Sequence, residues 1–448
     1  MGESDATTSL FWSAMGGPPD LVEGVSYRGA GPVLPARLPV RELARATVGV
    51  CSLAAAELLS VRTGDPVRPV EVDEGAVATA FVSERHLRVD GRPMVPFAPL
   101  SGFWRTADGW VRTHANYPHH RERLLAALGL AQGADADGLG RELAGRSARQ
   151  VQETVYAAGG LAVAVADHPD PTRPPLVESR VMGGIGKDLP GPVDLPASGV
   201  RVLDLTRVIA GPVATRTLAL LGADVLRVDT PRSPEDRDTH IDTAPGKRST
   251  LLDLDTTEDR ARFEDLLATA DVVITGYRPG ALDRYGLSPE DLAERRPGLI
   301  TAGLCAWGWS GPRSGRRGFD SLVQAGVGIA AVEAGEDGAP GALPAQALDH
   351  GTGYARAAAV LRALADRAAD GRGRDLRLSL AGTAGLLLHG IEPTSAPEGA
   401  HDPERWLTTT DSPYGGLRYA RSPLGYAGAP TDWATPPTLW GGDRPVWR

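Results

Sequence analysis

The alternation of apolar and polar positions after residue 200 predicts a succession of strands and helices. Apolar runs predict strands at 202–205, 224–228, 249–254, 272–275 and 299–304. Stretches with helical periodicity predict helices at 213–221 and 257–268. Strands that alternate with helices are typical of a parallel sheet. We therefore predict an α/β fold whose large domain contains a doubly wound, mostly parallel, Rossmann-like sheet.

The first 200 residues follow a different pattern. Residues 43–59 form an apolar helical stretch that ends at a Gly-Asp-Pro stop, and 67–72 follow as a strand. Residues 103–111 predict a hairpin, because two strand-like runs flank an Asp-Gly turn. Amphipathic helices follow at 119–128 and 144–158. This part of the chain predicts a smaller α+β domain.

Composition changes along the chain predict where these units meet. Residues 181–200 are rich in Gly and Pro, which is typical of a linker between domains. The predicted segments are a large-domain remnant at 1–90, the small α+β domain at 91–185, a linker at 186–199, the Rossmann-like large domain at 200–395 and a C-terminal tail at 396–448.

The remnant assignment depends on a partial internal repeat. A helix, a glycine turn and a strand occur near 54–73 and again at 361–380. Aligning Gly371 with Gly64 places Glu42 opposite Asp349, whereas matching the Leu-Pro-Ala runs that begin at 34 and 343 places Val40 there. Because the two alignments disagree on whether an acid lies opposite Asp349, we interpret the N-terminal copy as a structural remnant.

Overall composition narrows the class of protein. The 448 residues are 42% hydrophobic and 23% charged, as in ordinary globular proteins. A formal charge of −9 argues against a general nucleic-acid or anionic-membrane binder, although a local basic pocket stays possible. Cys51 and Cys305 have no metal-ligand spacing, so no metal site is predicted, and Cys305 is expected to be a buried core residue. With no secretory signal and no uncharged apolar run near ~20 residues, we expect a cytoplasmic protein without a membrane span.

Asp349 is the most prominent candidate for chemistry. It precedes Gly351, Gly353 and a long Ala- and Leu-rich helix, so we expect an acid on a loop at a helix start. The plain alternative is an N-cap. Other familiar motifs are missing: the turn at 206–215 has one glycine where a dinucleotide fingerprint needs three, and the GxxxxGK[ST], GxSxG and HExxH patterns do not occur.

Several motifs in order carry a family resemblance. VLDLTRVIAGPVATRTLALLGADVLRVDTP at 202–231, the R-P-G-x-x-x-R-x-G-L element at 278–287 and the G-F-D-x-x-x-Q-A element at 318–325 precede Asp349. Together these residues resemble the large domain of the class III CoA-transferases, which include formyl-CoA and carnitine CoA-transferases. Residues 95–180 resemble the small domain of that family and 411–448 its tail. The order is unusual, because family chains begin with the large domain.

The resemblance implies an activity, a mechanism and partners. It implies an acyl-CoA:carboxylate CoA-transferase in which Asp349 attacks the acyl-CoA thioester and then carries CoA as an aspartyl thioester. The implied substrates are acyl-CoA and a small carboxylic acid, with coenzyme A as substrate and no permanently bound cofactor. A homodimer is also implied.

The resemblance also assigns site residues. Gly351 and Gly353 are candidate backbone donors to an oxyanion. The candidate CoA contacts are Arg207, Val208, Ile209, Ala210, Lys247, Arg248, Tyr277, Arg284 and Trp307. For each arginine the alternative is a solvated surface charge.

Two other functions stay open. An acyl-CoA racemase or epimerase shares this fold, but resembling enzymes carry a Gly-His-Asp motif where this chain has Gly318-Phe319-Asp320. A non-catalytic CoA-binding pseudoenzyme is suggested by the unusual domain order. His350, next to Asp349, is expected to point elsewhere, so His350→Ala should retain most turnover while Asp349→Ala should abolish it.

Overall fold

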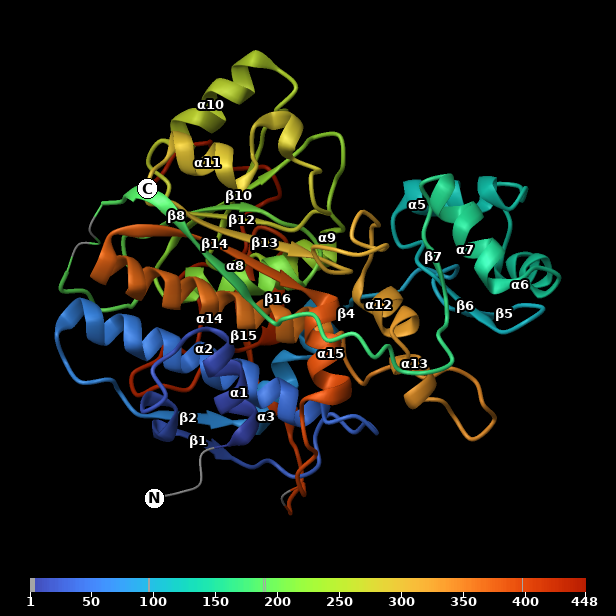
Figure 1. Ribbon diagram of the computed structural model, residues 1–448, viewed down its shortest axis with the longest axis horizontal. Helices are drawn as coiled ribbons and strands as arrows, with labels where there is room; N and C mark the ends of the chain where they lie inside the picture. Colours follow the sequence, from blue (N-terminus) through green and yellow to red (C-terminus); the bar gives the residue numbers. More distant parts are fainter. Residues whose placement is uncertain (1–4, 96, 188, 190, 397) are drawn as a thin grey trace.

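A seven-stranded sheet forms the centre of the computed structural model, which describes residues 5–95, 97–187, 189, 191–396 and 398–448 (Figure 1). Its strand order is β11-β10-β9-β12-β13-β14-β8; β8 is antiparallel to β14 and every other neighbouring pair is parallel. The strands are β8 (Glu178–Ile185), β9 (Arg201–Leu205), β10 (Asp224–Asp229), β11 (Arg248–Leu251), β12 (Val272–Thr275), β13 (Ile300–Cys305) and β14 (Arg372–Ser379). The predicted α/β content with a parallel sheet is confirmed.

Helices cover both faces of this sheet. Val202 packs in the core with α8 and α14, whereas its neighbour Leu203 packs with Phe263 of α10 on the other face. Burial on both faces explains why the strands read as continuous apolar runs. The helices of this unit are α8 (Ala210–Leu220), α9 (Arg237–Thr243), α10 (Thr257–Leu267), η2 (Asp283–Tyr285), α11 (Pro289–Arg295), α12 (Asp320–Gly326), α13 (Ile329–Val332), α14 (Ala347–Asp370) and α15 (Leu380–His389).

Helix α2 (Val40–Thr63) from the N-terminal segment packs along α14 (Figure 1). Both helices have 24 residues, and each ends at a left-handed glycine, Gly64 with φ 80° and Gly371 with φ 73°. Glycine adopts this conformation without the penalty of a side chain. The shared length and ending support the alignment that places Glu42 opposite Asp349.

Among the described residues, α2 is also the one helix long and apolar enough to cross a membrane by length and hydropathy. In the most apolar window of α2, 83% of the residues are buried inside the protein. A buried core helix passes the same test, so this finding is weak evidence for a membrane span.

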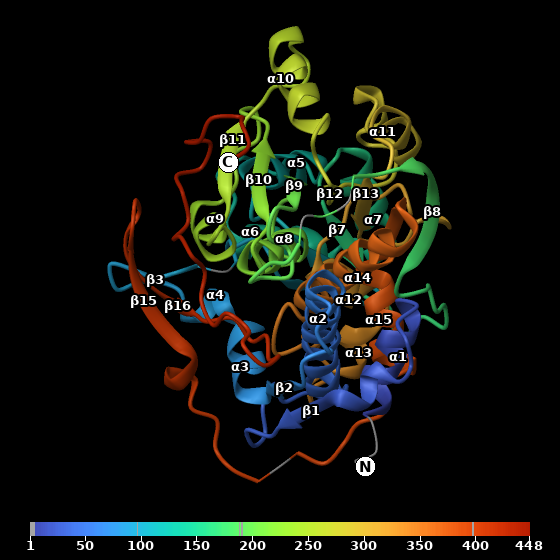
Figure 2. The same ribbon diagram turned by 90° about the vertical axis from the view of Figure 1, so that its left-hand side faces the viewer.

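The remaining elements form three smaller groups. Strand β1 (Val25–Arg28) pairs with β2 (Val70–Asp73), and a four-stranded sheet joins residues 88–93 to 407–420 across the chain (Figure 2). A three-stranded sheet with α5, α6 and α7 forms the small unit, which contains the predicted hairpin. These elements are α1 (Ala6–Ala14), η1 (Leu21–Gly24), α3 (Glu74–Ala80), α4 (Ser83–His86), β3 (Arg88–Val89), β4 (Arg92–Pro93), β5 (Phe103–Arg105), β6 (Trp110–Thr113), α5 (Pro118–Ala127), α6 (Ala136–Ala144), α7 (Ala148–Ala157), β7 (Ala162–Ala164), η3 (Pro403–Trp406), β15 (Leu407–Ser412) and β16 (Gly415–Ala420).

Strand β8 differs from the linker predicted at 181–200. Its last residues, 181–185, pair with β14 at the edge of the large sheet. Most side chains of β8 are exposed, so backbone pairing alone defines the strand and no apolar pattern marks it in the sequence. Residues 178–185 therefore belong to the large sheet, although they lie within the range predicted for the small domain.

Candidate active site

The turn that follows β9 is held in a strained conformation. Val208 has φ 70°, in the left-handed region that a β-branched residue rarely adopts. Its backbone N–H donates to Glu235 Oε2 at 2.9 Å. Such strain persists only where the surroundings fix it, and it concentrates at functional sites.

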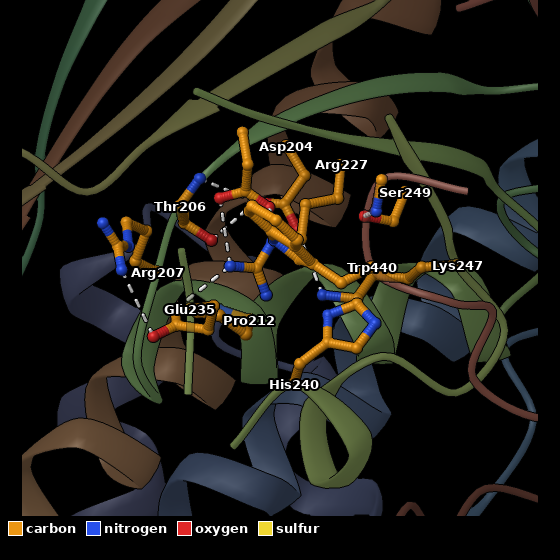
Figure 3. Close-up of polar contacts among 12 residues, drawn as sticks. Asp204, Thr206, Arg207, Pro212, Arg227, Glu235, His240, Lys247, Ser249 and Trp440 are labelled. Carbon is orange, nitrogen blue, oxygen red and sulfur yellow. Dashed lines mark hydrogen bonds and ion pairs between the residues drawn. The ribbon is translucent and has the colours of Figure 1, made fainter. Parts of the chain in front are cut away.

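A buried polar network around Asp204 fixes this turn (Figure 3). Asp204, at 0% exposure, accepts hydrogen bonds from the Thr206 backbone N–H at 3.0 Å, from Thr215 at 2.6 Å and from Lys247 Nζ at 3.1 Å. Burial lowers the pKa of Lys247 to about 8. Lys247 forms its ion pair with Asp204 inside the protein and is therefore not available to bind a ligand.

Glu235 connects the turn to the small unit. Its carboxylate accepts from Tyr117 Oη at 2.6 Å and from Arg227 Nη2 at 3.1 Å, and Arg207 lies 3.5 Å away. Burial acts to raise the pKa of Glu235, but Arg227 and Arg207 outweigh it and lower that pKa to about 2. A permanently ionised Glu235 thus holds Tyr117, Val208 and Arg207 together.

Asp349 is the third residue of α14 and 6% exposed, so it lies in the helix and not on the preceding loop as predicted. The helix lacks a side-chain hydrogen bond from its own N-cap residue, Gln346. Asp320 supplies a substitute: its Oδ2 accepts from the Asp349 backbone N–H at 2.9 Å. Gln324 in turn donates to Asp320 and accepts from the Leu343 backbone N–H at 3.0 Å. The Asp and Gln of the G-F-D-x-x-x-Q-A element therefore fix the start of α14.

The Asp349 carboxyl has no hydrogen bond or ion pair within the described parts of the chain. Burial raises its pKa well above the usual range, and the charges of Asp320 and Glu84 raise it further. An unpartnered, buried acid with a displaced pKa is a candidate for chemistry.

The Asp349 carboxyl faces a cavity of about 570 Å³ at the carboxyl ends of the central strands. Ligands of such sheets bind at this edge. Residues that follow β9, β12 and β13 line the cavity together with Tyr117, His119 and His120 of the small unit. The cavity therefore lies between the small unit and the large sheet.

Six arginines line this cavity, and Asp349 is the one acid among the residues that line it. Arg207, Arg232 and Arg316 have carboxylate partners at Glu235, Asp255 and Glu153, respectively.

The other three arginines of the cavity, Arg123, Arg278 and Arg317, have no carboxylate within ion-pair distance in the described residues. Burial, followed by the charges of Arg123 and Arg278, lowers the pKa of Arg317. Three unpaired, mutually repelling cations form a site for a polyanion.

Six of the predicted site residues come together here. Asp349 lines the cavity with Arg207, Val208, Ala210 and Tyr277, while Ile209 lines an adjoining cavity that also reaches Asp349. The guanidinium of Arg207 lies 5.3 Å from the centre of the Tyr117 ring. The structure therefore brings the turn after β9 and Tyr277 to the cavity, while their contact with CoA stays a prediction.

The other predicted contacts lie elsewhere. Arg248, which follows the buried Lys247 and begins β11, pairs with Asp224 at 2.8 Å, and Arg284 is an exposed side chain beside Tyr285. Trp307 is buried and donates to the Arg317 backbone oxygen at 3.1 Å. Like Lys247, these three residues do not line the cavity, so the structure does not bring them to Asp349; Trp307 instead supports the loop that carries Arg317.

Gly351 and Gly353 are inside α14, where backbone N–H groups are used by the helix itself. This placement removes the basis for the predicted oxyanion donors. A side chain at Gly353 would lie 2.8 Å from the Ala210 backbone oxygen, so this glycine permits the close approach of α8 and α14.

Neighbouring candidates have structural roles. The His350 ring stacks on Phe81 and lines neither cavity, as expected. Cys305 is 5% exposed and lines the cavity, but burial raises its pKa to about 12 and leaves the thiol protonated. Glu42 accepts hydrogen bonds from the Thr394 backbone N–H and from Arg41, so this acid links α2 to the segment around Thr394. No group of three or more metal-ligating side chains occurs in the described residues.

Several cavity residues were not found from the sequence. Arg278 and Phe319 lie in quoted motifs, and the rule that ligands meet the carboxyl ends of strands could have marked Arg278. Arg123 of this cavity and Glu84 of the adjoining one carry no local signal, because only the packing of distant segments brings them near Asp349.

Comparisons with known proteins find similarity to CoA-transferases. Residues 197–405 match the sequence model of CoA-transferase family III. The matched segment contains the parallel strands of the large sheet, the turn after β9 and Asp349.

Two relatives and one solved structure illustrate the similarity. The chain is 36% identical over 189 residues to the "Probable fatty acyl-CoA transferase Rv3272" of Mycobacterium tuberculosis, covering 39% of this chain and 48% of that protein. It is 33% identical over 203 residues to the "Succinate--glutarate CoA-transferase" of Agrobacterium fabrum, covering 41% and 51%. A crystal structure of Rv3272 from M. tuberculosis aligns with TM-score 0.41 at 36% identity, covering 42% and 54%. The chain spans about half the length of these relatives.

Proposed function

We propose that the chain is an acyl-CoA:carboxylate CoA-transferase that works through an aspartyl-CoA thioester on Asp349. The observation that carries this proposal is the pairing of one unpartnered carboxyl with three unpaired arginines in one cavity. CoA carries a diphosphate and a further phosphate, which match the arginines, and a thioester that can reach the carboxyl.

The chemistry needs only the carboxylate and the two substrates. An Asp349 oxygen attacks the thioester carbonyl, the C–S bond breaks, and a mixed anhydride and CoA thiolate form. The thiolate attacks the aspartyl carbonyl, which releases the donor acid and leaves CoA on Asp349. An acceptor carboxylate attacks this thioester and releases the thiolate, which then attacks the new acyl carbonyl and restores Asp349.

Two finer features belong to the same proposal. The strand order, with helices on both faces, supports a doubly wound, Rossmann-like large domain. We also propose a homodimer, as the family resemblance implies.

Trapping of the covalent intermediate tests the proposal. Wild type and Asp349→Ala are incubated with a panel of acyl-CoAs and then treated with hydroxylamine or borohydride. Intact-protein mass spectrometry should show a CoA-sized adduct before trapping, and peptide mapping should place the modification at Asp349. Binding of CoA without an adduct from any acyl-CoA, and without α-proton exchange, would instead indicate a CoA-binding pseudoenzyme.

One observation favours a racemase as the second candidate. Phe319 replaces the histidine that racemases carry, but His114 stacks on Phe319 with ring centres 3.8 Å apart and lines a cavity that reaches Asp349. Burial, followed by the charge of Arg112, lowers the pKa of His114 to about 3, so its imidazole is neutral but only a weak proton acceptor. Exchange of an α-proton into deuterated solvent without an adduct, lost in His114→Asn, would support this activity.

A further inference from the structure

A second cavity of about 300 Å³ adjoins the first at Asp349. Tyr117, Val208, Phe319 and Asp349 line both cavities, so these four residues form the boundary between them. In the proposed reaction the thioester carbonyl must lie at Asp349. If CoA occupies the arginine-lined side, the acyl group on the other side of that carbonyl faces the second cavity.

The walls of the second cavity are largely apolar. Met94, Val95, Phe97 and Ala98 form one side, and Ile209 with Phe319 forms another. Residues 94–98 lie outside the segment that matches the family. The cavity volume is several times that of a water molecule, about 30 Å³ in the liquid, so it has room for an acyl chain of short to medium length.

The charges of this cavity differ from those of the arginine-lined one. Its acids besides Asp349 are Glu84, Asp236 and Asp242, and Arg85 is the one arginine or lysine that lines it. Arg85 donates to the Pro344 backbone oxygen and lies 3.7 Å from Glu84. Among the described residues that line it, this cavity therefore holds no free cation for a ligand carboxylate.

The acids themselves already have partners inside the protein. Asp242 accepts from Ser83 Oγ at 2.7 Å and lies 3.5 Å from Arg216. Glu84 lies 3.8 Å from His350, which outweighs the opposing effect of burial and lowers the pKa of Glu84. These acids repel an anion without forming an open site for a cation.

We propose that the second cavity is the acyl chamber and that it selects acyl groups without a second carboxylate. The inference rests on the proposed transferase function. A terminal carboxylate would meet the little-exposed carboxylates of Glu84 and Asp242 with no free cationic partner among the described residues, which is unfavourable. An uncharged chain would instead cover Met94, Val95 and Phe97.

Butyryl-CoA and succinyl-CoA test this selection, because both acyl groups have four carbons and only one ends in a carboxylate. Single-turnover rates of adduct formation at Asp349 are measured for each at equal concentration. We expect butyryl-CoA to react at least tenfold faster. In Val95→Arg, which adds a cation at an exposed wall residue, the ratio should fall at least fivefold, and Glu84→Gln should lower it too.

Val61→Arg is the matched control, because Val61 is an exposed valine of α2 that lines neither cavity. The ratio of the butyryl-CoA rate to the succinyl-CoA rate in this variant should equal that of wild type. Equal rates for the two acyl-CoAs in wild type, or faster reaction of succinyl-CoA, would overturn the chamber proposal while the transferase function stands. Absence of an adduct from every acyl-CoA would overturn the transferase function and this inference with it.

Discussion

Asp349 must be ionised to attack a thioester, yet its surroundings favour the protonated form. Burial and the charges of Asp320 and Glu84 raise its pKa. The fraction of reactive carboxylate in the free protein therefore grows as the pH rises through a value above the usual ~3.9 of an aspartate.

The first prediction concerns the pH dependence of adduct formation. Single-turnover rates should rise with pH along a limb whose midpoint lies above the ordinary aspartate range. Glu84→Gln removes one repelling charge, so it should lower the pKa of Asp349 and move this limb to lower pH. A midpoint that stays in place or moves upward in Glu84→Gln would show that Glu84 does not act on Asp349.

The second prediction concerns stability. Because the folded-state pKa of Asp349 is raised, its neutral form contributes stability that is present below the unfolded-state pKa and lost as the pH rises through the folded-state value. Asp349→Asn cannot ionise, so it should melt about 1–3 °C above wild type at pH 8, and the difference should shrink toward pH 4. Asp65→Asn, at an exposed position, is the control and should show no such dependence. A difference that grows on acidification would contradict the assignment.

At the scale of elements, the pairing of α2 with α14 contains a buried ion pair. Arg362 donates to Glu57 Oε1 at 2.5 Å and to Asp366 Oδ1 at 2.7 Å, and the side chains of Arg362 and Glu57 are less than one-tenth exposed. Glu57→Ala should destabilise the protein by about 3 kcal/mol, the lower end of the range for broken buried pairs, because Asp366 remains.

Urea unfolding of Glu57→Ala measures this loss. Arg262→Ala removes an exposed pair with Glu258 in α10 and should cost no more than about 1 kcal/mol. Equal losses in the two variants would show that α2 and α14 do not depend on the buried pair.

The elements also show what a sequence pattern can predict. Strands β9, β10 and β12 were predicted because strands that are buried on both faces consist of continuous apolar runs, which are visible in the sequence. Strand β8 was missed because only its backbone joins the sheet. The Gly-rich start of α14 suggested a loop at Asp349, but Asp320, distant in sequence, caps the helix and extends it over this residue.

At the scale of the whole molecule, the site is assembled from segments that are far apart in the chain. Asp349 and the turn at 207–210 were predicted because local motifs mark them. Lys247 was assigned to the ligand because a charge beside a strand cannot be told from a buried partner until Asp204 is placed next to it. Arg123 could not be predicted at all, since it enters the cavity only through the packing of the small unit against the large sheet.

The last prediction tests that packing. Arg123 belongs to the small unit and Arg317 to the loop before α12, and both line the cavity without a carboxylate partner in the described residues. If each binds CoA phosphates, Arg123→Ala and Arg317→Ala should each raise the KM for acyl-CoA by about 10–100-fold. This factor corresponds to the free energy of a charge-assisted hydrogen bond. The corresponding acyl-pantetheine has no phosphates, so its kcat/KM should change less than about twofold.

Arg284→Ala is the matched control for this measurement, because Arg284 is an exposed arginine that lines neither cavity. It should leave the KM for both thioesters unchanged. A loss in Arg284→Ala equal to that in Arg317→Ala would place the phosphates on the surface near η2, as the sequence first suggested. A loss with acyl-pantetheine in Arg123→Ala would mean that the small unit shapes the reacting end of the cavity and does not hold the phosphates.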